Sequence, residues 1–289
     1  HHTYVAPPEL YEYYKPRVAM PRCLTDADNH RHPALQSHYL RAEEELIRRA
    51  RAAYYGMVEA VDAQVGLVYA AWQDYLRRRG RPGLFIYTSD HGDQAGEHDL
   101  WAKQTFFEGS ARVPMIFSGH GVRAGLRVRQ PASLMDLAPT LIEMAAARAL
   151  PEPDGISLLP ALSGQEDGRR SVVCEYYDPG ARGVDAPGRM LRRGPWKLMH
   201  YAGMEADDLL FNLDDDPGES RNVIAGHSDL ARELRAELHR GWDVEGLRRR
   251  YTVKQQHKAL IATWGRNAAP PETEVWNPPD CARVPPVVQ

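Results

Sequence analysis

Seven side chains that can bind a metal or carry a charge crowd into the fourteen positions from residue 90 to residue 103. They are Asp90, His91, Asp93, Glu97, His98, Asp99 and Lys103. Carboxylate oxygens suit Ca²⁺, Mg²⁺ or Mn²⁺, and a histidine among the ligands favours Mn²⁺ or Zn²⁺. Asp90 and His91 can both reach one ion where a strand turns into a loop. Two ligands are too few, so the other acidic residues and His98 are local candidates for the rest.

Each of these residues also has a purely structural interpretation. A lone Asp-His step after a core strand is more often a polar turn than a ligand pair, and only the crowding of polar groups favours the functional interpretation here. Lys103 is either a clamp for an anion or an ordinary solvated lysine, which is the commoner state. Glu108 could then be its structural ion-pair partner.

The elements that must position these residues are a strand directly before them and a long helix before that strand. Residues 84–87 form a short apolar run rich in β-forming residues, which predicts a buried strand. In open α/β sheets, ligands bind outside the carboxyl ends of strands, which is where the polar cluster falls. Residues 35–79 show helical spacing, with Gly56 as a candidate bend. The apolar face predicted for this helix comprises Leu46, Ala50, Ala53, Met57, Val61, Val65, Val68 and Trp72.

The rest of the chain divides at about residue 150, where proline and glycine become frequent. Before that point we expect an irregular segment at 1–33, a buried strand at 113–117 and a helix at 136–147 with Asp136 as its N-cap. After it, strands at 172–177, 189–193, 196–201 and 208–212 predict a small antiparallel sheet, and helices follow at 228–240 and 253–264. The expected parts are therefore 1–150, 151–266 and an extended Pro-rich tail at 267–289.

Composition restricts the class of protein. The chain of 289 residues is 43% hydrophobic and 26% charged, as is ordinary for a globular protein. Its net charge of −3 gives no case for nucleic acid or a membrane surface as partner, and no apolar run approaches the ~20 residues that span a bilayer. Cys23, Cys174 and Cys281 form no disulfide framework, which mildly favours a reducing compartment. The location stays open between cytoplasm and periplasm.

Four short stretches follow one another around the polar cluster: TSDHGD at 88–93, GE at 96–97, LWAK at 100–103 and FEGSARVP at 107–114. In this order they resemble the sulfatase family of the alkaline phosphatase superfamily. Lys103 follows Asp90 by thirteen residues, and this spacing is closest to that of the choline-sulfatase and phosphonate monoester hydrolase branch. Further similar stretches lie at 133–141, 154–159, 196–198, 209–213 and 216–222. The resemblance extends from residue 1 to about 225, and more weakly to Trp264.

This resemblance implies an α/β fold, in which an alkaline-phosphatase-like mixed sheet flanked by helices is only partly present. A small C-terminal α+β subdomain built on an antiparallel sheet would follow it. The implied activity is metal-dependent hydrolysis of sulfate monoesters, with hydrolysis of phosphonate or phosphate esters as the alternative. A non-catalytic fragment or degenerate paralogue is the alternative of another class.

The resemblance also assigns roles to individual residues. Asp90 and His91 would be two ligands of one divalent cation, with Ca²⁺ expected and Mn²⁺ or Mg²⁺ as alternatives. Lys103 would touch the oxygens of a small anionic sulfate or phosphate ester. His1 matches a His-x-Pro-aromatic segment whose histidine contacts the ester and helps the leaving group. Thr3 stands where proline is usual, so His2 is the alternative substrate-binding histidine.

The chain departs from the family pattern in the parts that supply the nucleophile. None of the three cysteines lies in the Cys/Ser-x-Pro/Ala-x-Arg motif that matures to formylglycine, and no adjacent aspartates lie on a first strand. We therefore expect this chain to be the C-terminal part of a longer enzyme and to be inactive alone. The formylglycine and the remaining metal ligands would come from the missing N-terminal part. The tail with Trp276 could reach a neighbouring subunit of a homo-oligomer.

Overall fold

The computed structural model describes residues 3–21, 31–168 and 170–268. Two compact units make up the chain, His1–Trp242 and Asp243–Gln289. The predictions for His1, His2, Cys23, Cys281 and most of the tail fall outside the described residues. The division at residues 150 and 266 stays a prediction.

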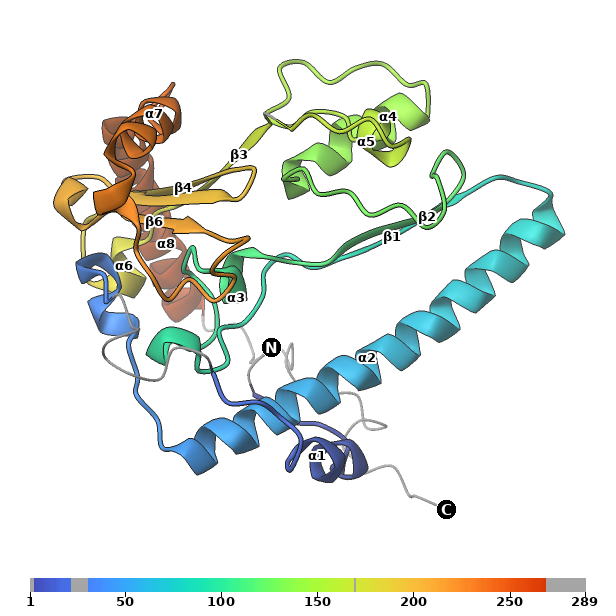
Figure 1. Cartoon of the computed structure of the whole chain (residues 1–289), viewed down its shortest axis with the longest axis horizontal. Helices are drawn as coiled ribbons and strands as arrows, with labels where there is room; N and C mark the ends of the chain where they lie inside the picture. Colours follow the sequence, from blue (N-terminus) through green and yellow to red (C-terminus); the bar gives the residue numbers. More distant parts are fainter. Residues whose placement is uncertain (1–2, 22–30, 169, 269–289) are drawn as a thin grey trace. The chain divides into compact units, whose positions relative to one another are not determined.

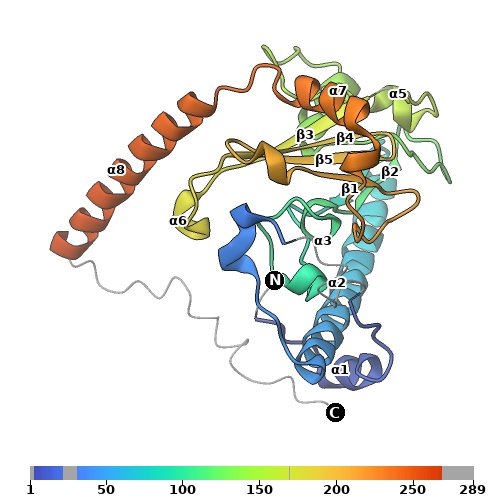
Figure 2. The ribbon, with the colours of Figure 1, turned by 60° about the vertical axis from the view of Figure 1, so that its left-hand side comes forward.

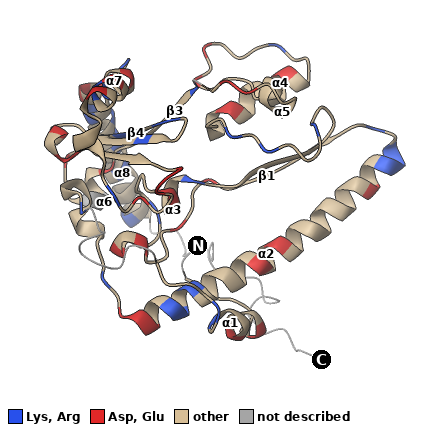
Figure 3. Ribbon diagram, in the orientation of Figure 1, with Lys and Arg blue, Asp and Glu red and all other residues tan. Residues whose placement is uncertain are grey.

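Helix α2, Glu44–Arg79, is the longest element and packs against the short helix α1, Pro8–Tyr14 (Figure 1). The prediction of an irregular segment was wrong for α1. The predicted helix at 35–79 begins later than expected: α2 starts at Glu44, and a 3₁₀ turn, η1, occupies Pro33–His38. Gly56 does not bend α2. A Cβ atom there would lie 2.8 Å from the Cβ of Ala6, so the glycine allows the segment leading into α1 to approach. Acidic residues in the first turn and arginines in the last complement the helix dipole (Figure 3).

The buried face of α2 differs from the predicted one. Arg51 is only 8% exposed, whereas Leu46 is 55% and Val68 60% exposed. Helical spacing of apolar residues shows that a stripe exists, but the neighbouring elements decide which stripe is covered. Among the described residues, those neighbours are α1 and the loop that carries the polar cluster. Nearer the end of α2, Tyr69 and Trp72 pack on Phe85 with ring centroids 5.0 and 5.5 Å away.

The strands β1, Leu84–Thr88, and β2, Met115–Gly119, form an antiparallel pair in which Leu84 faces Gly119 and Thr88 faces Met115. Both predicted strands are present, but β2 begins two residues later than predicted. Neither is fully buried in this chain: β1 is half-buried, and Ile116 of β2 is 56% exposed. The Tyr69 hydroxyl lies 2.7 Å from the Ser118 hydroxyl and joins α2 to this pair. The carboxyl end of β1 therefore has a fixed place beside α2, and the polar cluster begins there.

The C-terminal sheet confirms the predicted antiparallel sheet. Its strands are β3 Ser171–Tyr176, β4 Gly188–Arg193, β5 Trp196–Tyr201 and β6 Leu209–Asn212, in the order β3-β4-β5-β6. Helix α7, Ser228–Leu238, covers one face with Leu234 and Leu238, both fully buried (Figure 2). A second core cluster joins Tyr201 and Phe211 of the sheet to Phe106 and Phe107. The segment after the polar cluster is thereby anchored in the C-terminal core.

The remaining elements are short, apart from α8. They are η2 Glu97–Asp99, α3 Glu108–Ala111, η3 Leu134–Asp136, α4 Leu137–Met144, α5 Leu159–Leu162, α6 Pro179–Arg182, η4 Glu205–Asp207 and η5 Ile224–Gly226. Asp136 stands at the N-cap position of α4, which confirms that part of the prediction, but its side chain makes no capping hydrogen bond to α4. Ser133 caps η3, and the buried Asp136 accepts hydrogen bonds from the backbone of Ser133 and Ile156. Helix α8, Val244–Ala268, is longer than predicted. Within the described ranges, no helix is long and apolar enough to cross a membrane.

Candidate active site

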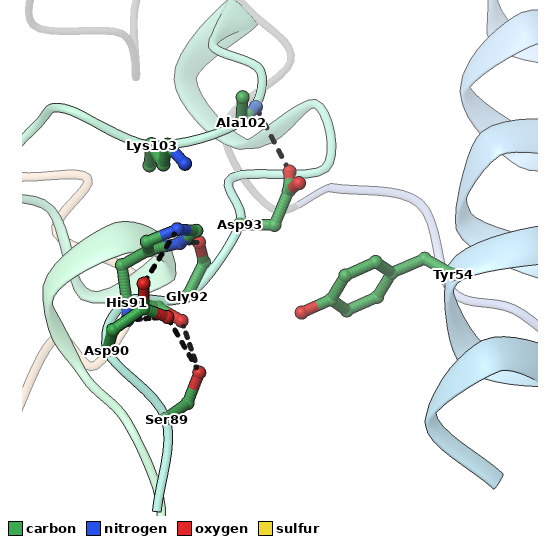
Figure 4. A pocket seen from close by; sticks show the side chains of 8 residues that line it. All are labelled: Tyr54, Ser89, Asp90, His91, Gly92, Asp93, Ala102 and Lys103. Carbon is green, nitrogen blue, oxygen red and sulfur yellow. Dashed lines mark hydrogen bonds and ion pairs between the residues drawn. The ribbon is translucent and has the colours of Figure 1, made fainter. Parts of the chain in front are cut away.

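A cavity of about 270 Å³ opens at the carboxyl end of β1. It is lined by Tyr54, Ser89, Asp90, His91, Gly92, Asp93, Ala102 and Lys103 (Figure 4). All but Tyr54 come from the segment between β1 and α3. The structure thus brings three of the predicted site residues, Asp90, His91 and Lys103, to one cavity.

Asp90 presents its carboxylate to solvent at the cavity, with 85% of the side chain exposed. The backbone N–H of His91 donates to its Oδ1 at 3.0 Å, and the Ser89 hydroxyl donates to the carbonyl of His91 at 2.8 Å. Desolvation alone would raise the pKa of Asp90. His91, two backbone amides and Lys103 together hold that pKa below its ordinary value. The carboxylate is therefore ionised and available to a cation.

The imidazole of His91 is oriented by its own backbone. Its Nδ1 lies 2.8 Å from the carbonyl oxygen of Gly92. A carbonyl only accepts, so Nδ1 carries the proton and Nε2 has the lone pair in the neutral ring. A histidine that binds a metal commonly donates its other N–H to such a carbonyl.

The Nε2 atom of His91 and the Oδ2 atom of Asp90 both have lone pairs and face each other. His91 Nε2 lies 3.5 Å from Asp90 Oδ2, a separation that one ion could span because metal bonds to nitrogen and oxygen are about 2.0–2.6 Å long. This donor pair fits a divalent cation. No group of three or more His, Cys, Asp or Glu side chains suited to a metal occurs among the described residues. The pair supplies two ligands, and a complete site needs more.

Asp93 holds the loop together. Its Oδ1 accepts from the backbone N–H groups of Ala95 at 2.9 Å and Ala102 at 3.0 Å, and the Tyr4 hydroxyl donates to its Oδ2 at 2.8 Å. The lone pairs of this carboxylate are largely used by these donors. Asp93 therefore positions residues near the cavity, and its oxygens are engaged by the protein's own donors rather than open to an ion.

Side chains from several elements fix the rest of the loop. Arg51 of α2 pairs with Glu97 at 3.1 Å, Arg31 pairs with Asp99 at 2.8 Å, and His98 is buried. These residues hold the loop and are not exposed ligands. The loop also contains five non-glycine residues with positive φ, which is a strained backbone. They are Ala95, His98, Asp99, Ala102 and Gln104.

The backbone of Gly92 lies close to the backbone of α3, and this contact supports the loop. The N–H of Gly92 donates to the carbonyl of Ser110 in α3 at 2.8 Å. A Cβ atom on Gly92 would lie 2.2 Å from the carbonyl oxygen of Gly109, so only glycine fits there.

Lys103 lies at the cavity with its side chain half-buried. Its charge contributes to the lowered pKa of Asp90. Glu108, the structural partner considered for it, is engaged with the fully buried Lys197, whose Nζ lies 2.9 Å from Glu108 Oε1 and 2.7 Å from Glu219 Oε1. This buried network anchors the start of α3 to the C-terminal sheet.

Two family models match the chain. The Sulfatase model covers residues 2–147, and the model for the C-terminal region of N-sulphoglucosamine sulphohydrolase covers residues 96–243. The chain belongs to the sulfatase family. Choline-sulfatase of Rhizobium meliloti is 35% identical over 239 residues, which are 78% of this chain and 44% of that protein.

Solved structures agree with this assignment. A 2-O GAG sulfatase aligns with a TM-score of 0.65 and 29% identity over 76% of this chain and 51% of that one. A phosphonate monoester hydrolase of Silicibacter pomeroyi has a TM-score of 0.65 and 25% identity, over 78% and 50%. The chain therefore spans about half the length of these relatives. Sulfatases generally use a metal ion and a formylglycine, so the expected class of cofactor agrees with the family.

Sequence reasoning missed Tyr54 in this sulfatase chain. Helical spacing placed it on a helix, but nothing in the sequence relates position 54 to position 90. Arg51, three residues earlier on the same helix face, is buried and pairs with Glu97, but this burial follows from the fold and gave no signal in the sequence. His1 and His2, the predicted contacts of the ester, lie outside the described residues.

Proposed function

We propose that this chain supplies one part of the active site of a metal-dependent hydrolase of sulfate monoesters. The observation that carries the proposal is the convergence of Asp90, His91 and Lys103 on one cavity, with the imidazole lone pair facing the Asp90 carboxylate. Family membership supports the reaction class, and the name of the choline-sulfatase relative supports a small anionic ester as substrate.

Each residue then has a definite task. Asp90 Oδ2 and His91 Nε2 hold the divalent cation, and the Gly92 carbonyl keeps the imidazole in the required tautomer. Lys103 places a point charge beside an oxygen of the ester, where charge develops in the transition state. His1, or else His2, gives a proton to the leaving alcohol. When bound, the cation acts as a Lewis acid on the same group and the formylglycine supplies the nucleophile.

The identity of the ion follows from the donor set only in part. A carboxylate and an imidazole accept Ca²⁺, Mn²⁺ or Mg²⁺, and further oxygen ligands would favour Ca²⁺. We propose Ca²⁺, with additional carboxylates and the formylglycine contributed from outside this chain. Finding Cys/Ser-x-Pro/Ala-x-Arg and an adjacent pair of aspartates in the coding sequence upstream of His1 would support this division of the site.

Hydrolysis of a phosphonate or phosphate ester is the second candidate. The phosphonate monoester hydrolase of similar fold favours it, because a cavity that binds a tetrahedral oxyanion accepts either group. Sulfate monoesters carry one negative charge and phosphate monoesters carry about two at neutral pH. The number of cations around the bound group would therefore separate sulfate from phosphate monoesters. A phosphonate monoester carries one charge, as a sulfate monoester does, and only kinetics separate those two.

The test is a comparison of 4-nitrophenyl sulfate, phosphate and phenylphosphonate as substrates of the complete protein that contains this chain. We expect the highest kcat/KM with the sulfate ester, and loss of activity after chelation that Ca²⁺ restores. A higher kcat/KM with the phosphonate would establish the second candidate. Absence of turnover with all three in a protein loaded with metal would favour a non-catalytic paralogue.

A further inference from the structure

Tyr54 is the only described residue of the cavity wall that comes from α2. In Figure 4 its phenol oxygen points across the cavity toward the loop that carries Asp90, His91 and Asp93. The mechanism derived above does not use this side chain. Its hydroxyl is nevertheless a polar group directed at the space where the ester would bind.

The position of Tyr54 relative to the loop is fixed by its neighbours. Arg51, one turn earlier on the same face of α2, forms the ion pair with Glu97 of the loop at 3.1 Å. The ring of Tyr4 meets the ring of Tyr54 edge-on, with centroids 5.9 Å apart. Tyr4 also binds Asp93 through its hydroxyl. Arg51 thus joins α2 to the loop directly, and Tyr4 joins them through its ring contact with Tyr54 and its hydrogen bond to Asp93.

The hydroxyls of Tyr4 and Tyr54 differ in what they bind. Tyr4 donates to the Asp93 carboxylate at 2.8 Å, whereas in the described part of the chain no hydrogen bond joins the Tyr54 hydroxyl to another group. Burial, and then the nearby charge of Asp93, raise the pKa of Tyr54 above its ordinary value. The phenol is therefore neutral at physiological pH and keeps its proton for donation.

We propose that the Tyr54 hydroxyl donates a hydrogen bond to an oxygen of the tetrahedral anionic group of the ester, on the side of the cavity formed by α2. This inference rests on the proposed function, because it assumes that Lys103 and the ion held by Asp90 and His91 bind the same group. Tyr54 adds a neutral donor to these two cationic contacts. A neutral donor orients the anion without increasing the positive charge of the cavity.

The test compares Tyr54→Phe with Tyr55→Phe in the complete protein loaded with metal. Tyr55 is a matched control because it is the next residue on α2, does not line the cavity and loses only a 3.4 Å contact from Arg51. Two quantities are measured for each variant: the dissociation constant of inorganic sulfate by calorimetry, and kcat and KM for 4-nitrophenyl sulfate. Thermal unfolding establishes that both variants are folded.

We expect Tyr54→Phe to raise the dissociation constant of sulfate about tenfold or more, as for loss of a hydrogen bond to a charged group, and to lower kcat/KM by a similar factor. Tyr55→Phe should match the wild type in both. Equal sulfate affinity in Tyr54→Phe and the wild type would overturn the proposal, even if KM for the aryl ester rose. Absence of turnover in the wild type would contradict the proposed function, whereas the sulfate measurement would still decide the role of Tyr54.

Discussion

Two Asp–His pairs in the described part of the chain lie in opposite surroundings. In the first, Asp90 and His91 are adjacent in sequence, their facing atoms are 3.5 Å apart, and the aspartate is 85% exposed. In the second, Asp208 and His200 of β5 are 2.8 Å apart and neither side chain is exposed. Arg235 of α7 binds the other carboxylate oxygen of Asp208 at 2.6 Å.

The difference shows that residue type alone does not define a site. A buried carboxylate must be paired with a cation or with hydrogen-bond donors, and Asp208 uses one oxygen for His200 and the other for Arg235. This pair ties β5 and the start of β6 to α7. Asp90 keeps a carboxylate oxygen that faces solvent and the His91 ring. The first pair therefore has capacity for a ligand, and the second is a structural connection.

The largest expected effect is a loss of stability when the buried pair of Asp208 and His200 is broken. Asp208→Ala should lower the free energy of unfolding by about 3 kcal/mol, because it leaves His200 and Arg235 without their shared anion. Urea denaturation followed by tryptophan fluorescence measures this change. Asp207→Ala, at an exposed neighbouring position, is the control and should change the free energy by less than about 0.5 kcal/mol. Equal stabilities of the two variants would contradict a structural role for the pair.

The next effect is on catalysis, at the cavity. Lys103→Ala should lower kcat of the complete protein about 10²-fold or more, which is roughly 2.7 kcal/mol, because the developing negative charge loses a cation. Its free energy of unfolding should stay close to that of the wild type. The control is Arg112→Ala, which removes a nearby cation whose side chain is 77% exposed and does not line the cavity. Unchanged kinetics in Lys103→Ala would make Lys103 an ordinary surface charge.

A smaller effect is expected on metal affinity. Asp90→Asn keeps the size of the side chain but removes its charge, so the dissociation constant of the divalent cation should rise about tenfold or more. Elemental analysis after dialysis against limiting Ca²⁺ gives the metal content. Asp207→Asn should retain the metal content of the wild type. If Asp90→Asn retained the metal content of the wild type as well, Asp90 and His91 would not form a metal site.

Sequence patterns predicted the C-terminal sheet better than the N-terminal region. The turn at Gly194-Pro195 and the short spacing between strands determine local pairings, so β4 and β5 were located to within a residue. The buried face of α2 was not predicted, because long-range packing covers Arg51 and leaves Leu46 exposed. Helix α1 was missed because its aromatic and proline residues have no sustained period.

The residues of the candidate site also differ in how well the sequence predicted them. Asp90, His91 and Lys103 lie within fourteen residues, so their proximity followed from sequence distance and from a strand end. Tyr54 reaches the cavity from another element, and its contribution depends on how α2 packs against the loop. The tautomer of His91 depends on a backbone carbonyl, which no pattern of residue types specifies.

The smallest predicted effect concerns the surroundings of the buried pair. His239 lies beside His200 with ring centroids 4.7 Å apart, and burial, then His200 and Arg235, lower the pKa of His239. The unfolded chain therefore binds a proton more readily than the folded one. This contribution to stability is complete above the unfolded pKa of 6.5 and is lost as pH falls through it.

His239→Gln should accordingly lose less stability than the wild type between about pH 7 and pH 5, as measured by urea denaturation at each pH. His257→Gln on α8 is the control, and an identical pH dependence for His239→Gln and the wild type would show that the surroundings of His239 do not lower its pKa.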